Sequence, residues 1–493
     1  MAPSTLAALC TEALGWPAGR QALEWQGGWI GWGRLAAIAR QVQQALEASH
    51  APRHAPVALV SRNRPETVAA LLALVAMGRS IRMIHPFQSS AGMATDLATA
   101  RPGALLAAAA DIDGPVRDSI DALGIAAIAL APDGATVVAP GGWRGPPPPA
   151  PDGGPDIQIL TSGTTGPPKH FAMTHRMIAE RLVLPALSDG AGTDWEQAPP
   201  VVLYFPLGNI SGIYATLPAL LKGQRAVLLD RFSLDAWLDY IERHRPSSSG
   251  IPTSAMRALL DADVAPERLS SLRAMGMGAA PLDPALHRAF EARYGIPILL
   301  SYGATEFAGP VTAMTAALHA EHGAARFGSV GRALPGVQLR IVDPSSGAQL
   351  PPGSEGLLEV VAPRIGPHWI RTSDLAVLDA DGFLFHRGRA DGAILRGGFK
   401  LLPETIESAL AAHPDVAEAM VVPVPDDRLG QVPAALVVPR PGADPGADLL
   451  AIHLRHLLPA THLPVHWLMV AQLPLNASHK RDRRAAAALF AQG

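Results

Sequence analysis

Residues 159–170 read Ile-Leu-Thr-Ser-Gly-Thr-Thr-Gly-Pro-Pro-Lys-His, and they indicate the fold of this chain. The apolar run at 157–161 predicts a strand that leads directly into a loop rich in glycine and hydroxyl groups. Gly163 and Gly166 permit backbone conformations that point successive N–H groups into one concavity, and Lys169 adds positive charge. The spacing differs from the GxxxxGK[ST] pattern of a Walker A loop. The segment is therefore a candidate phosphate site of another kind.

Strands and helices alternate on both sides of this loop. The expected strands are 56–60, 157–161, 201–205, 225–229 and 298–301, and the expected helices include 233–244, 253–261 and 283–294. This order predicts an α/β architecture with a parallel sheet. Residues 64–78 have Pro65 at the start, Gly78 at the end and apolar residues on every face, which predicts a buried helix.

The pattern changes twice toward the C-terminus. Residues 327–386 contain short alternating strands, among them 337–342 and 356–361, and a turn at 379–382, which together predict a small β-subdomain. After residue 390 the expected order is a strand at 393–395, a helix at 403–412, strands at 416–422 and 434–438, and a helix at 447–458. That order is typical of a compact α+β domain. The predicted domains are 1–388 and 389–493.

Composition narrows the classes of function. A chain of 493 residues with 48% hydrophobic content should form more than one domain. A formal net charge of −3 and the absence of a basic run with aromatics argue against a nucleic-acid partner. The single cysteine, Cys10, excludes an internal disulfide, and no run of eighteen uncharged apolar residues occurs. We therefore expect a cytoplasmic protein without a membrane span.

Lysine is scarce in this chain. Only four of the forty basic residues are lysines, namely Lys169, Lys222, Lys400 and Lys480. Lysine is expected to remain mainly where a compact ammonium cannot be replaced by a planar guanidinium. Three of the four lie in segments that carry candidate chemistry, although chance survival is the alternative.

Residues 161–169 resemble the TSGTTGxPK loop of the adenylate-forming superfamily, which includes acyl-CoA synthetases, peptide-synthetase adenylation domains and beetle luciferases. Further segments follow in family order, so the resemblance covers nearly the whole chain. It implies a large N-terminal α/β domain with parallel sheet and a small β-subdomain, followed by a small mobile α+β domain. It also implies ATP, Mg²⁺ and coenzyme A as cofactor and co-substrates.

Three further segments resemble the family's nucleotide motifs. Residues 302–306 (Tyr-Gly-Ala-Thr-Glu) resemble YGxTE, 278–282 resemble GxAPL, and 372–374 (Thr-Ser-Asp) resemble TGD with Ser373 in place of glycine. The resemblance implies that Thr305 meets the α-phosphate and that Glu306, which alone would be only a solvated acid, holds magnesium. Lys169 is the third residue assigned to catalysis. The implied ATP- or AMP-binding residues are Thr161, Ser162, Gly163, Thr164, Thr165, Gly166, Gly278, Ala279, Ala280, Tyr302, Gly303, Asp374 and Arg389.

The C-terminal segments imply domain motion and thiol entry. Residues 388–392 resemble the GRxDD hinge, with Asp391 at the pivot, and 396–400 resemble the pantetheine tunnel, with Gly398 and Phe399 at its lining. Residues 473–480 resemble LPxTxxGK. Lys480 is thereby implied as the ammonium that bridges the substrate carboxylate and an ATP oxygen.

Residues 204–212 occupy the place of the family's PLFHxxG segment and suggest the acid class. Gly208 stands where an aromatic residue is frequent and Asn209 where histidine is frequent. With Gly303 they form the predicted acid pocket, which favours a bulky apolar acid: alicyclic, polycyclic, aryl or long acyl. Neighbouring side chains could refill this space. The segment lacks the aspartate of amino-acid-activating relatives.

The predicted function is an ATP-dependent ligase that joins a carboxylic acid to coenzyme A through an acyl-adenylate. One alternative is an enzyme that loads the acyl group onto a separate carrier protein. Another is a catalytically silent nucleotide-binding protein, suggested by Ser373, Thr405 and His479, which depart from the family pattern.

Overall fold

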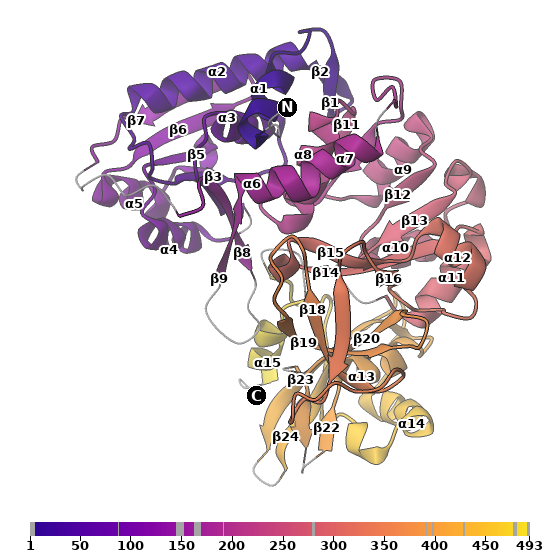
Figure 1. Cartoon of the computed structure of the whole chain (residues 1–493). Helices are drawn as coiled ribbons and strands as arrows, with labels where there is room; N and C mark the ends of the chain where they lie inside the picture. Colours follow the sequence, from indigo (N-terminus) through magenta and orange to yellow (C-terminus); the bar gives the residue numbers. More distant parts are fainter. Residues whose placement is uncertain are drawn as a thin grey trace. The chain divides into compact units, whose positions relative to one another are not determined.

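A computed structural model describes most of the chain (Figure 1). The described residues are 5–86, 88–143, 152–161, 169–190, 192–278, 282–390, 392–396, 399–426, 429–476 and 481–490. Contacts divide the chain into two compact units. Unit 1 comprises Met1–Gly250, Ala258–Arg273 and Ala304–Gly309, and unit 2 comprises Ile251–Arg257, Ala274–Gly303 and Pro310–Gly493. The predicted division at 388/389 stays a prediction.

The largest sheet of unit 1 has seven strands in the order β7-β6-β5-β3-β4-β8-β9. The strands are β3 (Val57–Val60), β4 (Ile81–Ile84), β5 (Ala104–Ala108), β6 (Ala126–Ala131), β7 (Gly134–Ala139), β8 (Asp156–Thr161) and β9 (Lys169–Thr174). The central strands are parallel, whereas β7 and β9 pair antiparallel at the two edges. This arrangement confirms the predicted α/β class with parallel sheet.

Helices cover both faces of this sheet (Figure 1). On β3, the side chains of Val57 and Leu59 pack with α1, α2 and α3, and those of Ala58 and Val60 pack with α4 and α5. The alternation follows from the two-residue period of a strand. The helices are α1 (Leu6–Leu14), α2 (Trp32–Ala48), α3 (Pro65–Ala76), α4 (Ser90–Ala100) and α5 (Pro115–Leu123), with a short turn η1 (Ala109–Asp111).

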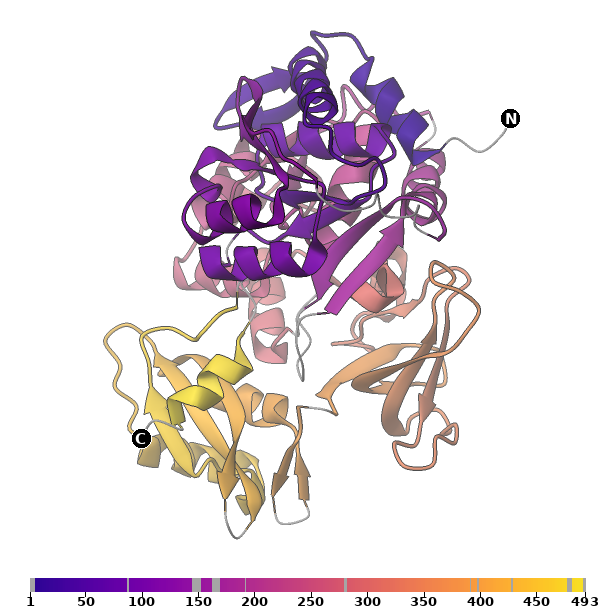
Figure 2. The same ribbon diagram turned by 90° about the vertical axis from the view of Figure 1, so that its left-hand side faces the viewer.

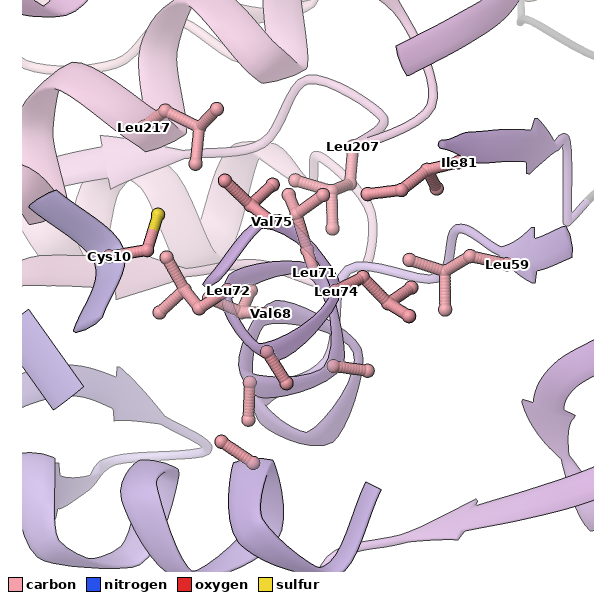
Figure 3. Packing of buried hydrophobic residues seen from close by; sticks show 14 of the residues in the cluster. Cys10, Leu59, Val68, Leu71, Leu72, Leu74, Val75, Ile81, Leu207 and Leu217 are labelled. Carbon is pink, nitrogen blue, oxygen red and sulfur yellow. The ribbon is translucent and has the colours of Figure 1, made fainter. Parts of the chain in front are cut away.

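Helix α3 is buried nearly all round, as predicted. Figure 3 shows its side chains pointing toward different neighbours, including Cys10, Leu59 and Leu207. Burial raises the pKa of the Cys10 thiol to about 12, so this cysteine is a small core side chain.

A second sheet of unit 1 has the order β10-β11-β1-β2. Its strands are β1 (Gln21–Trp25), β2 (Gly28–Gly31), β10 (Val201–Leu203) and β11 (Ala226–Leu228). The remaining elements between β9 and β13 are α6 (His175–Ile178), η2 (Ala179–Val183), α7 (Leu184–Asp189), α8 (Ile210–Leu221), α9 (Leu234–His244), β12 (Ser248–Gly250), α10 (Thr253–Asp261) and η3 (Pro266–Leu269).

Unit 2 contains two parallel strands and an antiparallel sheet. Strands β13 (Ala274–Met277) and β14 (Ile298–Ala304) are parallel and are joined through α11 (Pro284–Tyr294). The sheet β17-β18-β19-β20 is antiparallel throughout, which confirms the predicted β-rich segment. Of the elements that follow β14, η4 (Thr305–Phe307) belongs to unit 1. The others are β15 (Gly309–Ala313), α12 (Ala316–His322), β16 (Arg332–Ala333), β17 (Gln338–Val342), β18 (Glu355–Val361), β19 (Ile370–Leu378) and β20 (Leu384–Arg389).

The C-terminal part of unit 2 is a layered α+β structure (yellow in Figure 2). Helices α13 and α14 pack on one face of its sheet, and α15 packs on the other face. The elements are β21 (Ile394–Arg396), β22 (Phe399–Leu401), α13 (Pro403–Ala411), β23 (Val416–Asp426), β24 (Gly430–Pro439), α14 (Ala447–Leu457), η5 (Ala460–His462), β25 (His466–Met469) and α15 (Arg483–Phe490). Over the described ranges, no helix has the length and apolarity needed to cross a membrane.

Candidate active site

The predicted phosphate loop joins two paired strands. Thr161 at the end of β8 pairs with Lys169 at the start of β9, so the backbone brings the two ends of the loop side by side. Of these two residues only the backbone is described. Ser162, Gly163, Thr164, Thr165 and Gly166 lie outside the described residues, and their predicted roles stay predictions.

Gly278 directly follows β13, and Tyr302 lies near the carboxyl end of the neighbouring parallel strand β14. Ligands of parallel sheets bind at this edge. A Cβ atom at Gly278 would lie 2.6 Å from Oγ of Ser301, so a larger residue here would require Ser301 of β14 to shift. Gly303 is the next-to-last residue of β14, while Ala279 and Ala280 are outside the described residues.

Tyr302, Asp374 and His386 form a compact polar cluster within unit 2. The Tyr302 hydroxyl donates to Oδ2 of Asp374, and Nε2 of His386 lies 3.5 Å from Oδ1 of the same carboxylate. The His386 ring also stacks on the Tyr302 ring, with centroids 5.7 Å apart and an interplanar angle of 29°. Burial raises the pKa of Asp374, but the bonds from His386 and Tyr302 and the charge of Arg389 outweigh burial, so the pKa lies below its usual value. Asp374 is therefore an ionised acceptor.

An irregular register brings this cluster together. Asp374 pairs with Arg389, yet Ala376 pairs with His386, so β20 carries one extra residue opposite β19. A regular register would have placed Arg387 opposite Ala376, on the face of Asp374. Gly388 supplies the required backbone with φ of +125°. The bulge thus turns the His386 imidazole toward the carboxylate.

Arg389 is held by Ser373, the residue that replaces the glycine of the TGD motif. Its Nη2 donates to Oγ of Ser373, and the backbone N–H of Ala390 donates to the carbonyl of Ser373 over 2.6 Å. Ser373 is therefore an acceptor for Arg389 at this position.

Thr305 and Glu306 lie in the turn η4 that follows β14. Glu306 is exposed, and the buried Ala308 after it has φ of +54°, an unusual conformation that reverses the chain into β15. Across the described parts of the chain no group of three His, Cys, Asp or Glu could hold a metal. Magnesium typically uses one or two carboxylates plus substrate phosphate oxygens, so the single exposed Glu306 fits an ion that arrives with the nucleotide.

The predicted acid segment is tied to the chain between β3 and α3 in unit 1. The Asn63 side chain donates to the carbonyls of Phe205 and Leu229 over 3.0 and 3.1 Å and accepts from the N–H of Leu207 at 2.9 Å. Asn63 is 5% exposed, and all three bonds span more than 140 residues of sequence. It therefore fixes the path of the segment after β10.

Gly208 and Asn209 have different surroundings. A Cβ atom at Gly208 would lie 2.2 Å from Oγ and 3.1 Å from Cβ of Ser61, so this glycine permits close packing on the residue that follows β3 and leaves no open space. Asn209 precedes α8 without capping it through its side chain, which is half-buried. A Cβ at Gly212 would lie 2.1 Å from the carbonyl oxygen of Pro206, which explains the glycine at the end of the segment 204–212. Gly303, the third predicted pocket residue, belongs to unit 2.

Asp391, Gly398 and Lys480 lie outside the described residues, and only the backbone of Phe399 in β22 is described. The chain that flanks Lys480 is nevertheless anchored. Leu475 pairs with Arg481, and the N–H of Asp482 donates to the carbonyl of Pro474 over 2.9 Å.

Two arginines and a buried glutamate fix the end of this segment. Arg481 and Arg483 both pair with Glu407 of α13, at 3.3 and 2.7 Å, and each also donates to a backbone carbonyl of β23. Arg483 also pairs with Glu404 at 3.1 Å. His386, Asn63 and Glu407 are not among the residues predicted from the sequence, because each acts through partners distant in sequence. The one local signal was the position of His386, two residues before Gly388 of the hinge motif.

Comparison with known proteins supports one family. The model of AMP-binding enzymes matches residues 11–366, and that of the AMP-binding enzyme C-terminal domain matches residues 405–480. A rice protein (Oryza sativa subsp. japonica) named 4-coumarate--CoA ligase-like 6 is 33% identical over 63% of this chain and 57% of its own length. A fatty acid ligase for acyl-carrier protein from Streptomyces coeruleorubidus, ScoC, is 30% identical over 67% of this chain and 66% of its own.

Solved structures show the same fold. ATP-bound MatB from Rhodopseudomonas palustris superposes with a TM-score of 0.81 at 24% identity and with 99% of each chain covered. In the sequence comparison, the matched region spans little more than half the length of the rice protein.

Proposed function

This chain belongs to the AMP-binding enzyme family, and from this premise we propose that it is an ATP-dependent acid:thiol ligase. It converts a carboxylic acid to an acyl-adenylate and transfers the acyl group to coenzyme A. The contact of Tyr302 with Asp374, with Arg389 on the neighbouring strand, is the observation that carries the proposal. A partly buried, ionised carboxylate beside an aromatic ring and a guanidinium suits the ribose, adenine and phosphate of a nucleotide.

The chain acts mainly through positioning and charge. Lys480 and Lys169 neutralise phosphate oxygens, Thr305 donates to the α-phosphate, and Glu306 would hold magnesium. Such electrostatic and orienting effects supply most of the rate in phosphoryl chemistry. Magnesium, when bound, offsets the charge that develops as pyrophosphate departs.

The acceptor is proposed to be free coenzyme A. The name of ScoC motivates the alternative that the acyl group is passed to a carrier protein. Turnover with free coenzyme A alone distinguishes the two acceptors, because the alternative requires a separate carrier protein.

The acid is proposed to be bulky and apolar. The support comes from the small side chain at Asn209, and the absence of aspartate in 204–212 disfavours an α-amino acid. Gly208 supplies none of the space, since Ser61 fills the volume beside it. An aryl, alicyclic, polycyclic or long acyl group would have to use the space near Asn209.

The proposal is tested by pyrophosphate release from ATP and magnesium with a panel of aryl, alicyclic, polycyclic and long-chain acids, each with and without coenzyme A. Turnover that requires coenzyme A is expected. Release that ignores coenzyme A would favour a carrier acceptor, and nucleotide binding without release would favour a silent binding protein.

The role of Lys480 is tested by separating the two half-reactions. Lys480→Ala should lose acyl-adenylate formation by about 100-fold or more yet retain thioester formation from supplied acyl-adenylate. Lys222→Ala is the matched control, because Lys222 ends α8 and stacks over Trp195 at 3.9 Å, outside every candidate segment. Equal loss of both half-reactions in Lys480→Ala would contradict the assigned role.

A further inference from the structure

We infer that His386 is a positioning residue of the nucleotide site, where it orients the Asp374 carboxylate for the hydroxyls of the ribose. The inference rests on the proposed function and adds a residue that neither the sequence motifs nor the family description assigns.

The carboxylate of Asp374 is held at both oxygens. Tyr302 donates to Oδ2, and Nε2 of His386 lies 3.5 Å from Oδ1. The Asp374 side chain is 13% exposed and that of His386 is 21% exposed, so water competes weakly for this contact. An ionised carboxylate accepts about four hydrogen bonds. With one donor at each oxygen, about two acceptor positions remain, which is the number that a ribose diol requires.

The His386 ring is itself fixed. It stacks on Tyr302 with centroids 5.7 Å apart, and the bulge at Gly388 sets the face from which it approaches. A donor whose own orientation is restrained restricts rotation of the carboxylate about its Cβ–Cγ bond. The two remaining acceptor positions are therefore directed before the nucleotide arrives.

A purely structural role makes a different prediction. If His386 only satisfies a partly buried carboxylate, its loss weakens the β19–β20 pair and lowers affinity for every nucleotide equally. If it orients Asp374 for the ribose, its loss matters only when the ribose hydroxyls are present. The coupling between His386 and these hydroxyls separates the two roles.

The experiment measures dissociation constants of ATP, 2′-deoxy-ATP, 3′-deoxy-ATP and 2′,3′-dideoxy-ATP by calorimetry, with the whole chain. His386→Phe keeps the ring stack but removes the nitrogens. Its Kd for ATP should rise about fivefold, the loss of one hydrogen bond, while its Kd for the dideoxy nucleotide should change less than about twofold. His386→Gln, which keeps an N–H donor, should recover part of the ATP affinity.

Arg387→Gln is the matched control, since Arg387 is the exposed neighbour on the same strand and should leave all four constants unchanged. Equal weakening of ATP and dideoxy-ATP by His386→Phe would overturn the inference while leaving the proposed function intact. Wild-type protein that binds none of the nucleotides would overturn both. If His386→Phe does not fold, a Kd of His386→Gln that is raised equally for all four nucleotides overturns the inference in its place.

Discussion

At the residue scale, the packing of Gly208 on Ser61 constrains the acid segment. The Ser61 hydroxyl donates to the carbonyl of Ile84 over 2.9 Å and is fully buried. A methyl group at position 208 would require this hydroxyl to move and give up its bond. The side chain at position 61 therefore determines which residue position 208 accepts.

Gly208→Ala should lower the free energy of unfolding by about 1–3 kcal/mol, because it overpacks a buried contact. The double variant Ser61→Gly/Gly208→Ala should regain most of that loss. Urea denaturation followed by tryptophan fluorescence measures both changes. Gly276→Ala is the control, since a Cβ there meets nothing within 4 Å. A double variant no more stable than Gly208→Ala alone would show that Ser61 is not the obstacle.

At the scale of elements, α13 fixes the segment that follows Lys480. The Glu407 side chain is 10% exposed and pairs with Arg481 and Arg483, whose side chains are 42% and 32% exposed. Glu407 also accepts from the N–H of Val421 over 2.8 Å. One carboxylate thus links α13, β23 and the start of α15, directly after the stretch of sequence that contains Lys480.

Glu407→Gln should lower the free energy of unfolding by about 1–3 kcal/mol, because two partly buried guanidinium groups lose their shared charge partner and solvent screens part of the loss. Acyl-adenylate formation should fall more than thioester formation from supplied acyl-adenylate. The two half-reactions and a denaturation curve measure these effects.

Glu418→Gln provides the comparison, because Glu418 is 43% exposed and lies 3.8 Å from Arg481. It should change stability by less than about 0.5 kcal/mol. Equal loss of both half-reactions in Glu407→Gln would argue against a specific effect on the Lys480 segment.

At the scale of the whole molecule, the core of unit 1 contains a histidine whose protonation opposes folding. His175 follows β9 and is 5% exposed. Within the described part of the structure neither ring nitrogen has a hydrogen-bond partner. Burial lowers the pKa of His175 to about 4, well below the ordinary value of 6.5.

The stability of unit 1 should therefore depend on pH. The unfolded chain binds a proton near pH 6.5 and the folded chain only near pH 4, so this contribution is complete above pH 6.5 and is lost as pH falls toward 4. The loss should be on the order of 3 kcal/mol.

Amide hydrogen exchange of β9 at several pH values reports on unit 1 without requiring two-state unfolding of the whole chain. In His175→Leu the decline between pH 6.5 and 4 should be smaller than in wild type. The exposed His54 gives the control variant His54→Gln, which should retain the decline. An unchanged decline in His175→Leu would assign the pH dependence to other groups.

The sequence by itself determined the elements and their class. Helix α3, the strand before the phosphate loop and the C-terminal order of strands and helices follow from periodicity and from glycine and proline positions, which act over a few residues. The elements that were predicted agree with the structure to within four residues at their ends. The resemblance of the motifs likewise predicted nucleotide-binding segments at Gly278, Tyr302 and Asp374.

Only the tertiary structure decided which of these residues meet. The approach of His386 to Asp374 depends on one extra residue in β20, and a register shift of one residue moves a side chain to the other face of a sheet. The packing of Gly208 on Ser61 and the pairing of Arg481 with Glu407 join residues separated by long stretches of chain. Local patterns carry no information about such distances, because the packing of layers and the strand register set these distances.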